Sequence, residues 1–256
     1  MTSVRLERKV GLAGAVFLMV GNVVGASIFI LPGTLAGIAG PAIFIAYLIA
    51  IIPAFFNTLV AAQVGSILPV SAADYVFTST VLHPLLGFLK VWAAMLGALV
   101  GGPILAYGFA DYFAFFAPDI NRVTLACLIV VSIMIINLLG IRSSVKIQMV
   151  MVSLFVSALL ILAIGGLFYI DGELLTPIAP LGWGAVLAAA VPAYYSYTGF
   201  TMLLSITEEI KNPAKNVPLI TLYTFLIVAF IYTSVTFVVP GLIHWQELGT
   251  IVAPLS

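Results

Sequence analysis

Residues 20–33 read VGNVVGASIFILPG, a run of small and polar residues inside a long apolar segment. Glycine is a poor helix former, and short polar side chains such as Asn22 and Ser27 compete for the hydrogen bonds of the helix backbone. Pro32 removes one further backbone donor. The stretch therefore predicts a helix that is interrupted near its middle.

An interruption of this kind has chemical consequences when the segment lies in a membrane. Lipid cannot satisfy freed N–H and C=O groups, so these groups must face protein or a water-lined cavity. Freed amides at a helix N-terminus attract a carboxylate, whereas freed carbonyls can hold an ammonium group or a cation. One interruption can therefore bind both charged ends of a zwitterion.

The same glycines also have a simpler explanation. Residues 21 and 25 form a GxxxG pair, and residues 33 and 37 form another, a pattern typical of close helix packing in membranes. The glycine spacing alone favours packing, whereas Asn22 and Ser27 favour an interrupted helix. Both interpretations stay open at this point.

The composition indicates that most of the chain faces lipid. Of the 256 residues, 63% are hydrophobic and 7% are charged, whereas a soluble domain carries about 25% charged residues. The formal net charge of zero argues against a nucleic-acid partner. The single cysteine, Cys127, excludes a disulfide within the chain. No ATP-binding GxxxxGK[ST] run occurs, and the apolar segments hold no cluster of ionisable side chains, so we expect no enzymatic activity and no cofactor.

Seven apolar stretches are long enough to cross a bilayer, which takes about 20 mostly apolar residues. Because the bilayer core offers no hydrogen-bond partners, each stretch is predicted to be helical. The chain is thus expected to be an all-α polytopic membrane protein, with a single transmembrane domain over residues 1–256 in contact with membrane lipid. The stretches cover approximately residues 10–36, 41–66, 85–117, 122–140, 146–170, 183–207 and 217–242.

The positive charges predict the orientation of these spans. Of the nine Lys and Arg residues, only Arg122 falls on one side of the predicted membrane. By the positive-inside rule the other side is cytoplasmic, so the N-terminus is predicted to be cytoplasmic and Ser256 to lie outside. A seven-helix receptor would have the opposite orientation. The eight residues on the cytoplasmic side are Arg5, Arg8, Lys9, Lys90, Arg142, Lys146, Lys211 and Lys215.

The remaining ionisable residues predict loop contacts and no metal site. His83 and His244 fall on opposite sides of the predicted membrane, so they cannot share a metal ion. Asp74 lies in a cytoplasmic loop near the third span, where it is expected to pair with Lys90 or Lys146.

The sixth apolar stretch contains a second interruption. Residues 192–201 read PAYYSYTGFT, which places a proline, a glycine, hydroxyl side chains and three tyrosines in one short segment. The tyrosines lie more than a helical turn from Trp183 and from Glu208, so a cavity lining is favoured over an interfacial aromatic belt. Two interrupted helices at corresponding positions are typical of secondary transporters that bind their substrate near the bilayer midplane.

Several motifs together resemble the amino acid–polyamine–organocation (APC) superfamily of permeases. Residues 21–29, GNVVGASIF, resemble its first-helix motif, and residues 196–200, SYTGF, resemble its sixth-helix motif. Residues 208–218, EEIKNPAKNVP, resemble the cytoplasmic loop after the sixth helix and are the most specific match. Residues 69–75 resemble the loop after the second helix. The resemblance extends over essentially the whole chain.

This resemblance implies a leucine-transporter-like fold of two inverted five-helix repeats, with helices one and six interrupted. It implies a secondary active transporter that moves amino acids across the plasma membrane by alternating access, with H⁺ or Na⁺ as the coupling ion. Because the second repeat begins with the sixth helix, the chain is expected to be truncated after helix seven and to lack C-terminal helices of the same polypeptide. Two alternatives stay open: a polyamine or organic-cation permease of the same superfamily, and a channel-like ion-translocating subunit.

The resemblance also implies a substrate site at the two interruptions. Backbone amides of Gly25, Ala26 and Ser27 would bind the substrate carboxylate. The carbonyls of Val23 and of residues 195, 196 and 198 would face its ammonium group. Tyr195 falls where related transporters place an aromatic gate.

The third helix is implied to line the side-chain pocket through Met95 and Leu99. No carboxylate lies deep in any predicted span, so the expected substrates are small or apolar neutral amino acids. The sequence departs from the family pattern at Ser27, where a third glycine is usual, and in the middle of the fifth span, where residues 147–170 contain no lysine for proton coupling. The predicted substrate-binding residues are Asn22, Val23, Gly25, Ala26, Ser27, Met95, Leu99, Tyr195, Ser196, Thr198 and Gly199.

Overall fold

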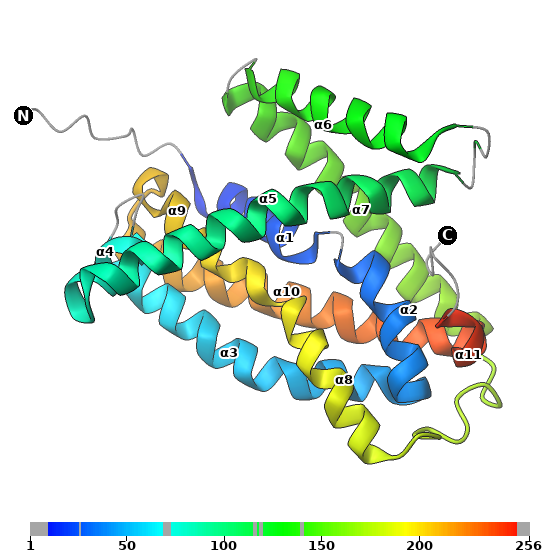
Figure 1. Ribbon diagram of the computed structural model, residues 1–256. Helices are drawn as coiled ribbons and strands as arrows, with labels where there is room; N and C mark the ends of the chain where they lie inside the picture. The colour runs from blue at the N-terminus through cyan, green and yellow to red at the C-terminus, as the bar shows by residue number, and fades with distance from the viewer. Residues whose placement is uncertain are drawn as a thin grey trace, which may run out of the picture.

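The structure, a computed structural model, describes residues 10–25, 27–68, 73–114, 117, 120–138 and 141–249, and leaves out the side chains of residues 141–146, 205 and 208. Within these ranges the chain is helical and has no β-strand. In chain order (Figure 1) the helices are α1 (Leu12–Val24), α2 (Ser27–Ala39), η1 (Gly40–Ala42), α3 (Ile43–Ile67), α4 (Ala73–Val81), α5 (Pro84–Ala114), α6 (Arg122–Leu138), α7 (Ile141–Gly166), η2 (Leu167–Tyr169), α8 (Trp183–Tyr195), η3 (Thr198–Met202), α9 (Leu203–Ile206), η4 (Thr207–Glu209), α10 (Pro213–Leu242) and α11 (Trp245–Leu248).

Each of the seven predicted stretches is mostly helical within the described residues. Four segments of the described chain are both long and apolar enough to cross a membrane: residues 12–67, 84–114, 147–169 and 213–242. The first of these runs from α1 through α3 and so contains the first two predicted spans. α6 is apolar but shorter, and the sixth stretch is divided by its interruption into shorter helices. Several apolar helices without strands in the described ranges indicate a polytopic, all-α membrane protein.

A tight turn separates the first two predicted spans. Gly40 has a φ of 66°, a left-handed conformation that glycine adopts without steric cost, and Pro41 follows it in η1. A Cβ on Gly40 would lie 2.6 Å from ring atoms of Pro180, so the segment before α8 packs directly on this turn. The Ala42 amide also donates a hydrogen bond to the Ile178 carbonyl in that segment.

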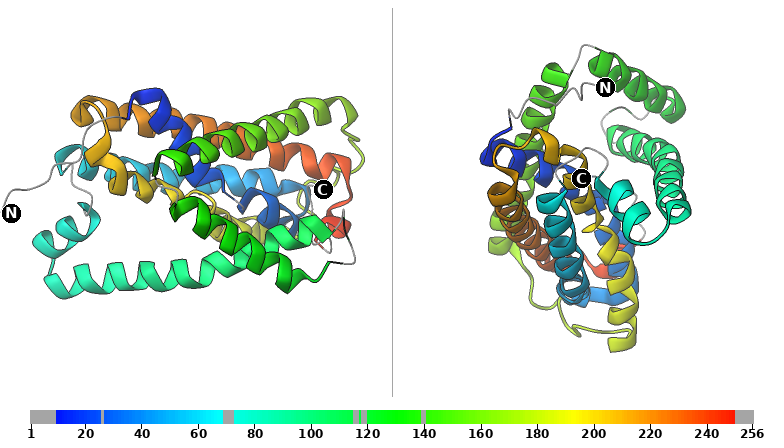
Figure 2. Two further views of the ribbon diagram at one scale, coloured as in Figure 1. Left: turned by 90° about the horizontal axis from the view of Figure 1, so that it is seen from above. Right: turned by 90° about the vertical axis from the view of Figure 1, so that its left-hand side faces the viewer.

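α10 lies at the centre of the packed part of the molecule. It packs against α3, α1 and α7, and α3 in turn packs against α8, an arrangement that the two views of Figure 2 show from different sides. The large side chains buried in this region include Met19, Ile28, Tyr47, Phe200 and Tyr232. α1, α3, α8 and α10 thus form a bundle around both interruptions.

α5 and its neighbours α4 and α6 lie at the side of this bundle. α5 packs on α4 and α6, and most of its described side chains are exposed as it crosses the bundle in Figure 1. It meets α2 near Phe29, whose carbonyl accepts a hydrogen bond from the Tyr112 hydroxyl. Apolar faces of this kind are costly in water because they stay hydrated, and they suit contact with lipid or with further helices.

Candidate functional site

The first predicted span is interrupted at Gly25. α1 ends at Val24, and the Gly25 amide still donates to the Gly21 carbonyl. Gly25 then has φ 35° and ψ −157°, which no helix contains, and this positive φ favours glycine over residues with a Cβ. α2 begins at Ser27. Ala26, between the two helices, lies outside the described residues.

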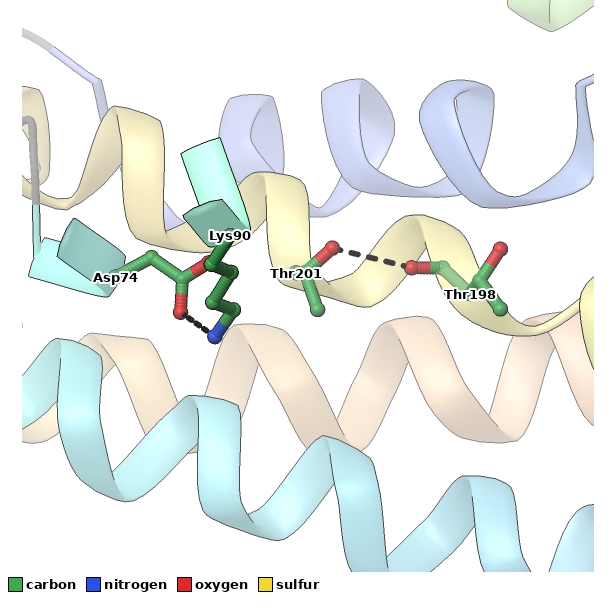
Figure 3. Close-up of polar contacts among 4 residues, drawn as sticks. All are labelled: Asp74, Lys90, Thr198 and Thr201. Carbon is green, nitrogen blue, oxygen red and sulfur yellow. Dashed lines mark hydrogen bonds and ion pairs between the residues drawn. The ribbon is translucent and has the colours of Figure 1, made fainter. Parts of the chain in front are cut away.

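The sixth predicted span is interrupted between Tyr195 and Thr198. α8 ends at Tyr195, residues 196–197 form a turn, and the 3₁₀-helix η3 leads into the short helix α9. Two threonine hydroxyls bond back to the carbonyls of this segment. The Thr198 hydroxyl donates to the Tyr195 carbonyl at 2.8 Å, and the Thr201 hydroxyl donates to the Thr198 carbonyl at 3.2 Å, as Figure 3 shows.

The two interruptions lie directly against each other. A Cβ built on Gly199 would lie 2.7 Å from the Cα atom of Val23 and 2.8 Å from the carbonyl oxygen of Asn22. Both of these are backbone atoms, which cannot rotate away as the end of a side chain can. Gly199 therefore allows η3 to contact the last turn of α1 backbone to backbone, and the structure brings together Asn22, Val23 and Gly199.

Tyr232, in the C-terminal half of α10, joins the two interruptions. Its hydroxyl lies 2.8 Å from the Val23 carbonyl oxygen and 3.2 Å from that of Val24. The same hydroxyl lies 3.0 Å from the Ser196 carbonyl oxygen and 3.2 Å from the Ser27 hydroxyl. A phenol has one proton, so it can bond fully to only one of the three carbonyls at a time, and the other two keep acceptor capacity.

Sequence reasoning did not identify Tyr232. A single aromatic residue in an apolar span has no periodicity that separates it from packing residues. The signal that was present is its depth, because Tyr232 lies at least ten residues from each end of α10, which spans Pro213–Leu242, whereas an interfacial tyrosine lies near a helix end.

Three buried tyrosine rings support this junction from behind. The ring centroids of Tyr197 and Tyr232 are 5.1 Å apart, and those of Tyr47 and Tyr232 are 5.7 Å apart. The hydroxyls of Tyr47 and Ser196 lie 3.4 Å apart. The Tyr197 hydroxyl, by contrast, is buried without a hydrogen-bond partner among the described residues. The cluster fixes the second interruption against α3 and α10.

The predicted side-chain pocket is not assembled at the interruptions in the described part of the chain. Met95 and Leu99 on α5 are 61% and 62% exposed, and Tyr195, the predicted gate, is 66% exposed. Their roles in binding therefore stay predictions. A pocket of about 620 Å³ does lie between α2 and a later part of α5, and its lining consists of Ile30, Val100, Pro103, Ile104, Tyr107, Gly108, Asp111 and Tyr112.

Two ion pairs lie near the two ends of α5. Lys90 pairs with Asp74 of α4 at 2.5 Å (Figure 3), which is one of the two partners that the sequence predicted for Asp74. Arg122 at the start of α6 pairs with Asp111 at 2.8 Å. The described residues contain no group of three His, Cys, Asp or Glu side chains that could hold a metal ion.

Comparisons with known proteins agree on a family. The family model described as amino acid permease matches residues 10–254. The branched-chain amino acid permease BcaP of Bacillus subtilis (strain 168) is 28% identical to the chain over 271 residues, which cover 98% of the chain and 58% of BcaP.

Further relatives carry other names. The methylthioribose transporter of Bacillus subtilis (strain 168) is 26% identical over 95% of the chain and 57% of its own length. The chloroplastic cationic amino acid transporter 9 of Arabidopsis thaliana is 26% identical over 95% of the chain and 47% of its own length. The chain thus spans about half the length of these curated relatives.

Proposed function

Because the chain belongs to the amino acid permease family, we propose that it holds the substrate-binding centre of a secondary active amino-acid transporter in the plasma membrane. The observation that carries this proposal is the junction of two interrupted helices, packed backbone to backbone at Gly199 and joined by Tyr232. Paired interruptions of this kind supply the backbone groups that bind substrate in transporters working by alternating access.

The first interruption supplies the binding site for the substrate carboxylate. The first turn of a helix has N–H groups without partners in the helix, and the positive end of the helix dipole favours an anion there. α2 begins at Ser27, directly after the irregular Gly25. The Ser27 amide in this first turn is therefore the proposed carboxylate ligand, whereas the Gly25 amide is already bonded to the Gly21 carbonyl and Ala26 lies outside the described residues.

The carbonyls around Tyr232 supply the binding site for the ammonium group. Val23, Val24 and Ser196 each present a carbonyl oxygen to one phenol proton, so they retain lone pairs for a second donor. The carbonyls of Tyr195 and Thr198 each accept one threonine hydroxyl and have a second lone pair. A substrate ammonium would make charge-assisted hydrogen bonds here, which are about twice as strong as neutral ones.

Small or apolar neutral amino acids are the proposed substrates. The described carboxylates Asp74 and Asp111 are paired with Lys90 and Arg122, away from either interruption in sequence, and BcaP carries the name of a branched-chain amino acid permease. The other relatives are named for methylthioribose and for cationic amino acids, so the side-chain pocket decides the substrate. Met95 and Leu99 are proposed to line that pocket when further helices pack on α5.

The proposed architecture is the leucine-transporter-like fold, in which the present helices form the first five-helix repeat and the start of the second. C-terminal helices of the same polypeptide would complete the second repeat and the site for the coupling ion, H⁺ or Na⁺. By the positive-inside rule, the distribution of Lys and Arg supports a cytoplasmic N-terminus.

Substrate-induced thermal stabilisation of the full-length protein in detergent tests this function. We expect saturable stabilisation by small apolar amino acids among the twenty common ones, and none by polyamines. A Ser27→Trp variant should lose the effect because the indole fills the first interruption, whereas Phe168→Trp at a position 84% exposed should keep it. Stabilisation by polyamines alone, or by no amino acid, would contradict the proposed substrate class.

A further inference from the structure

We propose that the pocket between α2 and α5 binds a second amino acid as a zwitterion, with its ammonium group on Asp111 and its carboxylate on Arg122. This pocket is called the α5 pocket below. The proposal rests on the proposed function for the class of ligand, an amino acid. It uses other residues, because the described lining of the α5 pocket includes none of the residues at the two interruptions.

α5 forms the longer wall of the α5 pocket. Val100, Ile104, Tyr107 and Asp111 all line it, and their spacing of four, three and four residues places them on one face of the helix. Because a helix rises 1.5 Å per residue, this wall extends about 16 Å from Val100 to Asp111. Its first half is apolar and its second half carries a hydroxyl and a carboxylate, so one end suits an apolar side chain and the other end suits charged groups.

α2 forms the opposite wall through Ile30. A Cβ added to Gly108 would lie 3.1 Å from the Cδ1 atom of Ile30, so a glycine at this position lets the two helices approach closely. The Tyr112 hydroxyl donates to the Phe29 carbonyl and holds α5 against α2 beside the pocket. The volume between these walls is about 620 Å³, within the range of about 300–1,000 Å³ that is usual for small-molecule sites.

An ion pair lies at the polar end of the α5 pocket. Asp111 pairs with Arg122 at 2.8 Å, and their side chains are 25% and 61% exposed. Exposed pairs are only weakly held because water screens the charges. A guanidinium has five N–H donors and a carboxylate has two acceptor oxygens, so each partner can bind a further group of opposite charge.

This pair of opposite charges selects for a zwitterion. A polyamine would neutralise Asp111 and leave Arg122 without its partner, and a simple carboxylate would do the reverse. A free amino acid replaces one ion pair by two, so every charge stays paired. Its side chain then lies toward Ile104, which favours an apolar one.

The α5 pocket lies beside the junction and does not overlap it. Ile30 is three residues beyond Ser27, the first residue of α2, and the charged end of the pocket lies further along α5. Both sites are therefore expected to hold an amino acid at the same time. Because Arg122 stays exposed to water, the α5 pocket should bind about tenfold more weakly than the junction.

Equilibrium binding of radiolabelled valine to the purified full-length protein in detergent counts these sites. The parent protein should bind one valine tightly and a second at about tenfold higher concentration. Asp111→Asn combined with Arg122→Gln should remove the weaker site alone. The matched control is Asp74→Asn combined with Lys90→Gln, which removes the other ion pair of α5 and should keep both sites.

A second variant separates the pocket from its charges. Ile104→Trp leaves Asp111 and Arg122 in place but fills the apolar end, at a position that is 58% exposed and so tolerates a larger side chain. It should also lose the weaker site, with a thermal unfolding midpoint close to that of the parent protein. Two sites retained in this variant, or in the variant without the Asp111–Arg122 pair, would overturn the proposal.

The Ser27→Trp variant distinguishes this proposal from the proposed function. It should lose the tight site and keep a weaker one that the Asp111 and Arg122 substitutions then remove. A parent protein with a single site that Ser27→Trp abolishes would overturn the second site and leave the proposed function standing. A single site that survives Ser27→Trp but needs Asp111 and Arg122 would support the α5 pocket and contradict binding at the junction.

Discussion

Two regions of the described chain differ in how closely they are packed: the junction of the two interruptions and the exposed face of α5. At the junction, α1, η3 and α10 are in backbone and hydrogen-bond contact around Gly199 and Tyr232. On α5, Met95 and Leu99 are more than half exposed. Both regions were implied by the same resemblance, yet only the first is assembled by these residues alone.

The difference separates two parts of substrate recognition. The backbone groups that would bind the charged ends of an amino acid come from helices that pack together in the described bundle. Recognition of the charged ends is therefore tied to the packing of this bundle. The side-chain pocket is proposed to be lined by Met95 and Leu99, which are mostly exposed among the described helices. We therefore expect changes at the junction to alter folding and binding together, and changes on α5 to alter specificity alone.

The largest effect is expected from Gly199→Ala. The added methyl group would overlap the Asn22 and Val23 backbone, and overpacking of this kind costs about 1–3 kcal/mol and occasionally more. Thermal unfolding in detergent should show a clear drop in Tm, accompanied by loss of amino-acid binding. Gly184→Ala on α8, where nothing lies within 4 Å of the new Cβ, is the control and should leave Tm unchanged or slightly raised. Equal behaviour of the two variants would contradict the close contact.

The next effect compares two tyrosines of one cluster. Tyr232→Phe removes the donor shared by three buried carbonyls, and leaving buried polar groups unsatisfied costs about 1–3 kcal/mol. Tyr197→Phe removes a hydroxyl that has no partner among the described residues, so it should be neutral or slightly stabilising. Denaturation of both variants alongside the parent protein gives the change in the free energy of unfolding for each substitution. A larger loss for Tyr197→Phe than for Tyr232→Phe would refute the assigned role of Tyr232.

A smaller effect is expected at the ion pair between α4 and α5. Lys90 and Asp74 have side chains that are 49% and 39% exposed, and exposed pairs contribute only about 0.2–1 kcal/mol. Asp74→Asn should lower Tm slightly at low salt, and the difference should shrink at 1 M salt because the charges are screened. A drop as large as that of Gly199→Ala would mean that the pair has a role beyond joining α4 to α5.

The smallest effect on stability is expected on the exposed face of α5. Met95→Ala and Leu99→Ala should change the free energy of unfolding by less than about 0.5 kcal/mol, as is usual for surface positions. If these residues line the pocket in the full-length protein, the relative affinity for two apolar amino acids should still change. The difference between their binding free energies should shift by about 1–3 kcal/mol at most. An unchanged ratio in both variants would remove Met95 and Leu99 from the proposed site.

Local chemistry explains which features the sequence could predict. Apolar length indicated the helical stretches, and glycine, proline and small polar residues correctly placed the interruptions near Gly25 and Ser196. The Val10–Ile210 pairing and the role of Tyr232 depend on contacts between residues about 200 positions apart. No spacing pattern along the chain encodes such contacts. The side-chain pocket could not be placed because its remaining wall is proposed to come from helices outside these residues.

The central claim is that the two interruptions bind both charged ends of an amino acid, and a series of three ligands tests it most directly. Binding of valine, isovalerate and isobutylamine to the full-length protein would be measured at equal concentrations. Isovalerate lacks the ammonium group and isobutylamine lacks the carboxylate, while the apolar part is the same. The account predicts saturable binding of valine and none of either analogue over the same range. Binding of either analogue as tightly as valine would contradict it.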